Sequence, residues 1–141
     1  MMTVLTAPEI DPAAGTLPDA LAADALDWHT VCRVADLEVA WGEAALIDGE
    51  QVALIKVSAS EVYAVAHRDP VTGAHVMARG IVGNKGWHRT LASPLHKEVY
   101  DLATGECFTD PALALRVYPV RLREGMVTVG LPADAAVGIA A

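Results

Sequence analysis

Short runs of hydrophobic residues, separated by turn-forming residues, cover the middle of the chain and predict β-strands. Most runs are about five to seven residues long and rich in β-branched side chains, which is too short for a helix. The predicted segments are 28–33, 43–47, 51–57, 61–66, 87–91, 98–101, 114–123 and 126–131. Several short strands at regular spacing predict an all-β fold, an antiparallel sandwich or barrel.

Turn residues between the runs predict how the strands connect. Asp48-Gly49-Glu50 lies between two apolar runs and indicates a β-hairpin, to which segment 61–66 adds the third strand of a meander. The apolar alternation of segment 114–123 changes phase at Pro119, which predicts a bulge on an edge strand. Residues 67–83 are punctuated by glycines and predict an irregular loop.

The two ends of the chain differ from this middle part. Residues 1–26 are rich in Ala, Pro and Asp and lack a sustained apolar period, which predicts a disordered or partly ordered tail. A short helical turn over 19–26 and a docking arm that orders on a partner remain alternatives. Residues 132–141 are small and apolar and predict a C-terminal tail, or a helical turn that packs on a partner. The chain therefore reads as one β domain, 27–131, between two tails.

Composition limits the classes of partner. The chain has 141 residues, enough for one domain with a core of its own, and 53% of them are hydrophobic. The net charge is −8, from 18 acidic and 10 basic residues. A surface this acidic repels phosphate backbones and anionic lipids, so we expect neither nucleic acid nor membrane partners.

The two cysteines and the start of the chain predict a compartment. Cys32 and Cys107 have no spacing typical of a metal site, and no secretory signal pattern opens the chain. No apolar stretch approaches the roughly 20 residues that a membrane span needs. These features predict a cytoplasmic protein with reduced thiols, and a Cys32–Cys107 disulfide remains the alternative.

Potential metal ligands gather in and near the long loop. They are His67, Asp69, His75, His88, His96 and Cys107. Two imidazoles and a carboxylate could hold iron or zinc, but no two of these histidines have a spacing that aims both rings at one point from a strand or helix. Ser93 and His96 lie close in sequence but do not form a nucleophile elbow. We therefore predict neither a metal site nor catalytic residues in this chain.

Two segments of the chain carry the most informative pattern. The first reads Arg68-Asp69-Pro70-Val71-Thr72-Gly73-Ala74, and the second begins Ala92-Ser93-Pro94-Leu95-His96 and continues to Asp101-Leu102-Ala103-Thr104-Gly105. Together they resemble the two cluster-holding loops of a Rieske iron–sulfur domain. Those loops read Cys-Pro-His-x-Gly-Ala in the first, and Cys-Pro-x-His followed by Phe-Asp-Leu-x-Thr-Gly in the second.

Most of the cluster ligands of that pattern are replaced. The two cysteine positions hold Asp69 and Ser93, the first histidine position holds Val71, and only His96 remains. A Rieske cluster needs two thiolates and two imidazoles, valine has no donor atom, and a serine hydroxyl is a poor ligand for iron. The resemblance therefore implies a Rieske-like domain without the cluster. We expect Asp69 and Ser93 to cap turns instead, and Val71 and Leu95 to fill the volume of the cluster.

This combination resembles one family, the small subunit of the assimilatory NAD(P)H-dependent nitrite reductase. The family's Arg-Asp-Pro-x-x-Gly-Ala, Arg-Gly-Ile-Val-Gly and Ala-Ser-Pro-Leu segments are found at 68–74, 79–83 and 92–95. The resemblance implies a Rieske-like fold with two extended loops and a non-catalytic role in nitrate assimilation. The implied partner is a large subunit that binds FAD, a 4Fe-4S cluster and sirohaem and reduces nitrite to ammonium. No cofactor is expected in this chain.

Exposed loops on a rigid β scaffold are common places for binding. Arginine and aromatic residues are favoured at interfaces, which makes the loop residues candidates for partner contact. They are Arg68, Arg79, Trp87, Leu95 and Lys97. Two other functions remain as alternatives: a free-standing Rieske-type ferredoxin that serves an oxygenase, and a small metal-dependent enzyme that uses His67, Asp69 and His96.

Overall fold

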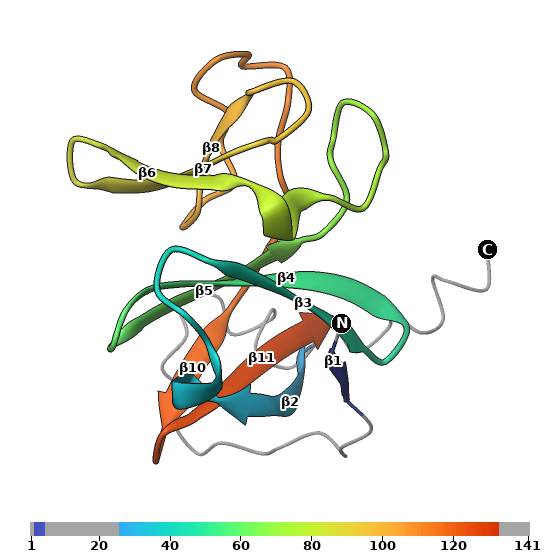
Figure 1. The fold of residues 1–141 in the computed structure, drawn as a ribbon. Helices are drawn as coiled ribbons and strands as arrows, with labels where there is room; N and C mark the ends of the chain where they lie inside the picture. Colours follow the sequence, from blue (N-terminus) through green and yellow to red (C-terminus); the bar gives the residue numbers. More distant parts are fainter. Residues whose placement is uncertain (1, 5–25, 133–141) are drawn as a thin grey trace.

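The computed structural model describes residues 2–4 and 26–132, which form an all-β domain (Figure 1). Its elements are β1 (Met2–Val4), β2 (Leu26–Arg33), β3 (Gly42–Ile47), β4 (Glu50–Ser58), β5 (Glu61–Ala66), β6 (Ile81–Lys85), β7 (His88–Ala92), β8 (Val99–Asp101), β9 (Val117–Tyr118), β10 (Val120–Arg123) and β11 (Met126–Pro132), with the short 3-10 helices η2 (Val34–Asp36) and η3 (Met77–Arg79). The predicted all-β class is confirmed. No helix in these two ranges is long and apolar enough to cross a membrane.

Three sheets make up the domain. The strand orders are β1-β3-β4-β5-β9, β10-β11-β2 and β6-β7-β8, and all pairs are antiparallel except the parallel pair β1–β3. Figure 1 shows the five-stranded sheet in the middle, with the β6-β7-β8 sheet on one side and the β10-β11-β2 sheet on the other. The central sheet is therefore covered on both faces.

Strand β4 shows how the sequence builds this arrangement. Successive side chains of a strand point to opposite faces. Val52 and Leu54 belong to the hydrophobic core shared with β2 and β11, whereas Ala53 and Ile55 belong to the core shared with β7 and β8. All four are fully buried, and a buried side chain of the size of Leu54 contributes about 1.5–3 kcal/mol. A continuous apolar run thus marks a strand buried on both faces.

The cysteines lie in different cores. Cys32 belongs to the core with β11, and Cys107 to the core beneath the β6-β7-β8 sheet. Both are free thiols. Because the central sheet separates the two cores, the alternative of a disulfide between them does not hold.

The predicted hairpin between β3 and β4 is confirmed. Ile47 pairs with Glu50, and the two residues between them, Asp48 and Gly49, have φ of 49° and 85°. Positive φ at both central positions is what a tight two-residue hairpin turn needs, and Asp-Gly adopts it at low cost.

Two predicted features are wrong. Residues 81–83, expected in an irregular loop, begin strand β6, because pairing with β7 supplies backbone hydrogen bonds that outweigh the weak strand preference of Gly83 and Asn84. Pro119, expected at an edge bulge, lies where the chain leaves one sheet for another: β9 pairs with β5, and β10 pairs with β11. Proline has no N–H to donate, so it fits this interruption between two ladders.

At the ends, Met2–Val4 forms β1, which pairs with β3 and lies inside the predicted N-terminal tail. Strand β2 begins at Leu26, the last residue of that tail and of its alternative helical turn. The remainder of the tail, 5–25, and the predicted C-terminal tail from 133 onward lie outside the described residues.

Candidate functional site

The loop between β5 and η3, residues 67–76 and here called loop 1, is closed by its own hydrogen bonds. The Asp69 N–H donates to the Ala74 carbonyl at 2.7 Å, and the Gly73 N–H donates to the Asp69 carbonyl at 2.8 Å. The Asp69 carboxylate also accepts from the Val71 N–H at 2.9 Å. Gly73 has φ of 79°, a conformation that glycine adopts without strain. The predicted turn cap at Asp69 is confirmed.

The loop between β7 and β8, residues 93–98 and here called loop 2, is closed in the same way. The Ser93 N–H donates to the Glu98 carbonyl at 2.9 Å, and the Lys97 N–H donates to the Ser93 carbonyl at 3.0 Å. The Ser93 hydroxyl accepts from the Leu95 N–H at 3.3 Å, which confirms the predicted cap. Each loop is therefore closed by hydrogen bonds between its own residues.

A buried hydrogen bond joins the two loops. The Ser93 hydroxyl donates to the Asp69 carboxylate at 2.9 Å, and both side chains are fully buried. These are the two positions at which the Rieske pattern has its cysteines. A hydrogen bond to a charged group contributes about 1.5–3 kcal/mol. Burial raises the pKa of Asp69, but the hydrogen bonds from Val71, Ser93 and Thr72 outweigh it and hold the pKa below its usual value.

The prediction that Val71 and Leu95 fill the volume between the loops is wrong. Val71 is 44% exposed and Leu95 is 51% exposed. The polar pair of Asp69 and Ser93 occupies the contact instead, and His96 is exposed. The loops thus present two apolar side chains and an imidazole to solvent.

The four degenerate positions do not fit a Rieske cluster. Asp69 and Ser93 bond to each other and offer no thiolate, and Val71 has no donor atom. Of the four positions, His96 alone keeps the residue type of the Rieske pattern. These four residues therefore give no basis for electron transfer through a Rieske cluster in this chain.

Two of the histidines counted above as potential metal ligands, His67 and His88, have other contacts. The Nδ1 atom of His67 accepts a hydrogen bond from the Ala78 N–H at 3.1 Å, and burial lowers the pKa of His67. The Nδ1 atom of His88 lies 2.9 Å from the carboxylate of Asp101. Within the parts of the chain that the structure describes, no group of three or more His, Cys, Asp or Glu side chains lies close enough to share a metal ion.

The structure places the five candidate interface residues at the surface but not at one point. Arg68 belongs to loop 1, and Leu95 and Lys97 belong to loop 2. Trp87, 88% exposed, lies in the turn between β6 and β7, and Figure 1 shows this turn at the end of the β6-β7-β8 sheet away from loops 1 and 2. Arg79, in η3, lies over the ring of another exposed tryptophan.

Sequence reasoning missed three exposed apolar residues outside loops 1 and 2, namely Trp41, Ile81 and Val39, of which Val39 is 58% exposed. The second tryptophan is Trp41, whose ring centroid lies 5.3 Å from the guanidinium of Arg79, and it is 54% exposed. Ile81, at the start of β6, is 57% exposed. No local sequence pattern marks these residues as exposed.

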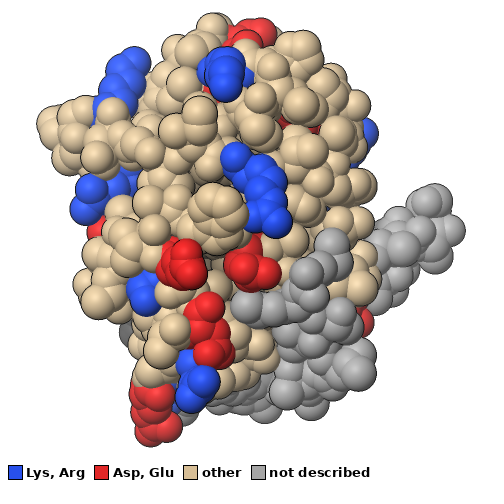
Figure 2. Space-filling view, viewed as in Figure 1, with Lys and Arg blue, Asp and Glu red and all other residues tan. Residues whose placement is uncertain are grey.

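Charge is distributed unevenly along the chain. The segment 67–116 contains six basic and five acidic residues, a net charge of +1, whereas the rest of the chain carries −9. In the view of Figure 2, most of the visible acidic side chains lie in the lower half and most of the basic ones in the upper half, where Figure 1 shows the loops. The loop-bearing end therefore differs electrostatically from the remainder of the domain.

Comparison with known proteins places the chain in a family. The model of the Rieske-like [2Fe-2S] domain matches residues 27–130. The nitrite reductase (NADH) small subunit of Salmonella typhimurium is 32% identical over 101 residues, which cover 71% of this chain and 94% of that protein. A Mycobacterium tuberculosis protein, described as a candidate NADH-dependent nitrite reductase small subunit, has a crystal structure that matches with 39% identity and a TM-score of 0.72, over 75% of this chain and 96% of that one.

Two further similarities bear on the alternatives. The nitrite reductase [NAD(P)H] large subunit of Klebsiella oxytoca is 30% identical over 103 residues, which are 73% of this chain and 11% of that protein. The ferredoxin of carbazole 1,9a-dioxygenase from Nocardioides aromaticivorans matches with a TM-score of 0.63 but 21% identity, over 72% of this chain and 95% of that one, and so shares the fold alone. Nitrite reductase small subunits are therefore the better match, and this chain belongs to their family of Rieske-like domains.

Proposed function

We propose that this chain is a non-catalytic small subunit that binds the large subunit of a nitrite reductase and supports it. The observation that carries this proposal is the Asp69–Ser93 hydrogen bond. It occupies the positions of two iron ligands and joins the two loops through their own side chains. Because these loops lack the ligands for iron, we infer that their function is to bind the large subunit.

The Klebsiella oxytoca protein supports the same partner. In that protein a region similar to this chain is part of a much longer polypeptide that is named a large subunit. A domain that occurs both as a separate chain and within a larger one is suited to packing against the rest of the larger one. The cofactors of the reaction, FAD, a 4Fe-4S cluster and sirohaem, are proposed to belong to the large subunit, and the complex is proposed to be cytoplasmic.

The loops supply the kind of surface that such a partner needs. Loops 1 and 2 are held by backbone hydrogen bonds, so little conformational entropy is lost when they bind. They present Val71 and Leu95, together with Arg68 and Lys97, at the less acidic end of the domain. Apolar side chains surrounded by charged ones are typical of non-obligate interfaces.

Co-expression with the large subunit from the same source tests the proposal. The two chains are expected to purify as one complex, and nitrite-dependent oxidation of NAD(P)H is expected from the complex but not from this chain alone. A purified chain that contains two irons and acid-labile sulfide would overturn the assignment. So would a large subunit that never retains this chain.

A matched pair of variants tests whether the loops make the contact. Val71 in loop 1 and Val39 between η2 and β3 are both exposed valines, at 44% and 58%. Val71→Asp is expected to weaken the complex by about tenfold or more, because it buries a charge at an interface, and Val39→Asp is expected to leave it unchanged. Equal effects of the two variants would place the interface elsewhere.

A further inference from the structure

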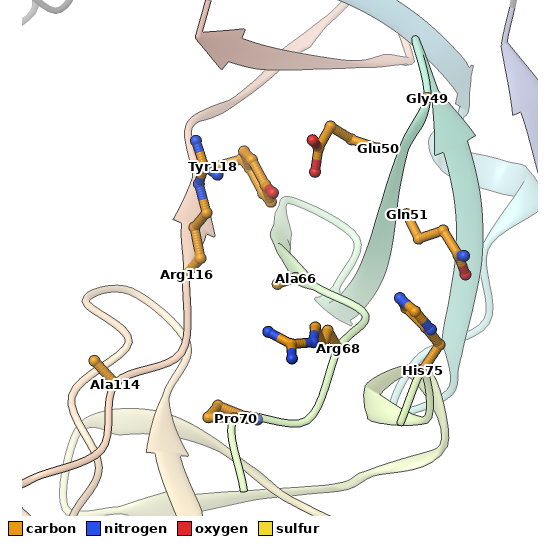
Figure 3. Close-up of a pocket in the computed structure, with 10 residues that line it drawn as sticks. All are labelled: Gly49, Glu50, Gln51, Ala66, Arg68, Pro70, His75, Ala114, Arg116 and Tyr118. Atoms are coloured by element: carbon orange, nitrogen blue, oxygen red, sulfur yellow. The ribbon is translucent and has the colours of Figure 1, made fainter. Parts of the chain in front are cut away.

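A cavity of about 460 Å³ opens between β4, loop 1 and the segment that leads into β9. It is lined by Gly49, Glu50, Gln51, Ala66, Arg68, Pro70, His75, Ala114, Arg116 and Tyr118 (Figure 3). The polar side chains come from three separate parts of the chain and converge on one space. Its volume lies in the range of small-molecule sites.

Two arginines dominate the charge of this cavity, here called the Arg68–Arg116 cavity. In the described ranges no carboxylate lies within 4 Å of either guanidinium, since the ion pairs there involve Arg33, His88 and Arg89. The guanidinium of Arg68 packs over Gly73, where an added Cβ would lie 3.1 Å from it. That of Arg116 lies over the ring of Tyr118, 5.3 Å from its centroid. Both cations are thus positioned by packing, without an acidic partner.

The remaining polar groups give the cavity two ends. Figure 3 shows the guanidinium of Arg116 beside Tyr118 and that of Arg68 below Ala66, with His75 and Gln51 on the opposite side. The single carboxylate in the lining, Glu50, interacts electrostatically with Tyr118, whose pKa is raised by burial and by this carboxylate. The two guanidiniums therefore lie at different places in the lining, one beside Tyr118 and one below Ala66, so each can pair with a carboxylate of its own.

We propose that the Arg68–Arg116 cavity binds a ligand that carries two carboxylates, one at each guanidinium. Arginine is suited to this because its planar fork donates two parallel hydrogen bonds to a carboxylate. The Gln51 amide and His75 supply further polar contacts along the cavity wall. The two carboxylates belong either to a free dicarboxylic acid or to two acidic side chains of a bound polypeptide segment. The second source rests on the proposed function.

Titration of the full chain with glutarate, followed by NMR or calorimetry, tests the site. Glutarate carries two carboxylates, and butyrate is a matched probe with one. Glutarate is expected to bind saturably at the cavity and more tightly than butyrate, and to weaken with added salt because both arginines are partly solvated. Arg68→Gln and Arg116→Gln are each expected to weaken glutarate binding by about tenfold or more. Arg33→Gln is the control, because Arg33 pairs with Asp36 outside the cavity and its loss is expected to change nothing.

Measurements on the complex with the large subunit distinguish a free dicarboxylic acid from acidic side chains of the partner. If the partner supplies the carboxylates, glutarate competes with complex formation and both cavity variants weaken the complex. If the ligand is a free acid, glutarate still binds the complex and Arg116→Gln, which lies outside both loops, leaves assembly unchanged. Either result supports the site. A complex that forms equally well with both variants, together with the absence of saturable glutarate binding, overturns it and leaves the small-subunit assignment intact.

Discussion

The hydrogen bond between Ser93 and Asp69 makes a quantitative prediction about stability. Ser93→Ala removes the hydroxyl that donates to the buried carboxylate at 2.9 Å, and with it the acceptor of the Leu95 N–H. The carboxylate keeps its bond from the Val71 N–H, and the N–H of Leu95, a residue that is 51% exposed, can bond to water instead. The main loss is therefore one charge-assisted hydrogen bond, about 1.5–3 kcal/mol. For a chain of this size that corresponds to a fall in Tm of roughly 5–10 °C.

Thermal and urea denaturation followed by circular dichroism measure this loss. Ser60→Ala is the matched control, because Ser60 is an exposed serine in the turn before β5, and it is expected to change stability by less than about 0.5 kcal/mol. Asp69→Ala alone and the double variant complete a thermodynamic cycle, in which we expect a coupling energy of about 1–3 kcal/mol. A Ser93→Ala variant as stable as Ser60→Ala would show that the bond between the loops contributes nothing.

The same bond predicts how stability depends on pH. The pKa of Asp69 is depressed in the folded protein, so its ionised form favours folding. This contribution is present above the unfolded value, about 3.9, and is lost as pH falls through the folded pKa. Ser93→Ala removes one cause of the depression, so the difference in stability from the parent chain is expected to shrink as pH falls below about 4. A difference that is constant between neutral and acidic pH would refute the role of the ionised carboxylate.

Three further predictions follow from the backbone and the cores. Gly105→Ala is expected to destabilise the domain by more than about 2 kcal/mol in urea denaturation, because φ is 81° and the new Cβ would clash with the Leu115 carbonyl oxygen. Gly86→Ala, with φ of 63° and open space, is expected to cost only about 1 kcal/mol. Tyr100→Phe is expected to preserve or raise the Tm, since the buried hydroxyl has no hydrogen-bond partner among the residues that the structure describes, and a clear fall would contradict this. Burial raises the pKa of Cys32 to about 11, so its thiol is expected to resist iodoacetamide at pH 8 in the folded protein and to react after unfolding, as mass spectrometry can follow.

The sequence predicts those parts of the fold that depend on neighbouring residues. The β3–β4 hairpin follows from Asp48-Gly49 between two apolar runs, and the turn caps follow from an Asp and a Ser that each precede a proline. Strand β6 could not be predicted in the same way, because Gly83 and Asn84 become strand residues only through pairing with β7. The change of sheet at Pro119 likewise depends on which partner each half of the segment finds.

The candidate sites show the same limit. The Rieske pattern identifies Asp69 and Ser93 from local motifs, but their mutual hydrogen bond joins positions 24 residues apart and is visible only in the folded chain. In the sequence, Arg68 comes before the strands β6, β7 and β8, and Arg116 comes after them. No spacing in the sequence predicts that the two residues line one cavity. The space between the two loops depends on how the folded loops pack, which the sequence does not show. Val71 and Leu95 were expected to fill that space, but both are exposed.

In this domain, the hydrogen bonds that close each loop differ from the one that joins the two loops. A Rieske cluster bridges its loops by bonds from both of them to one pair of iron atoms. Here the bridge is a single hydrogen bond, worth about 1.5–3 kcal/mol, which would not order two long loops that lacked structure of their own. Each loop is already closed by backbone hydrogen bonds, around Asp69 in one and around Ser93 in the other, so the bridge has only to set their spacing. Exposed side chains at positions 71 and 95 can then serve recognition, and under the proposed function they do so without a metal.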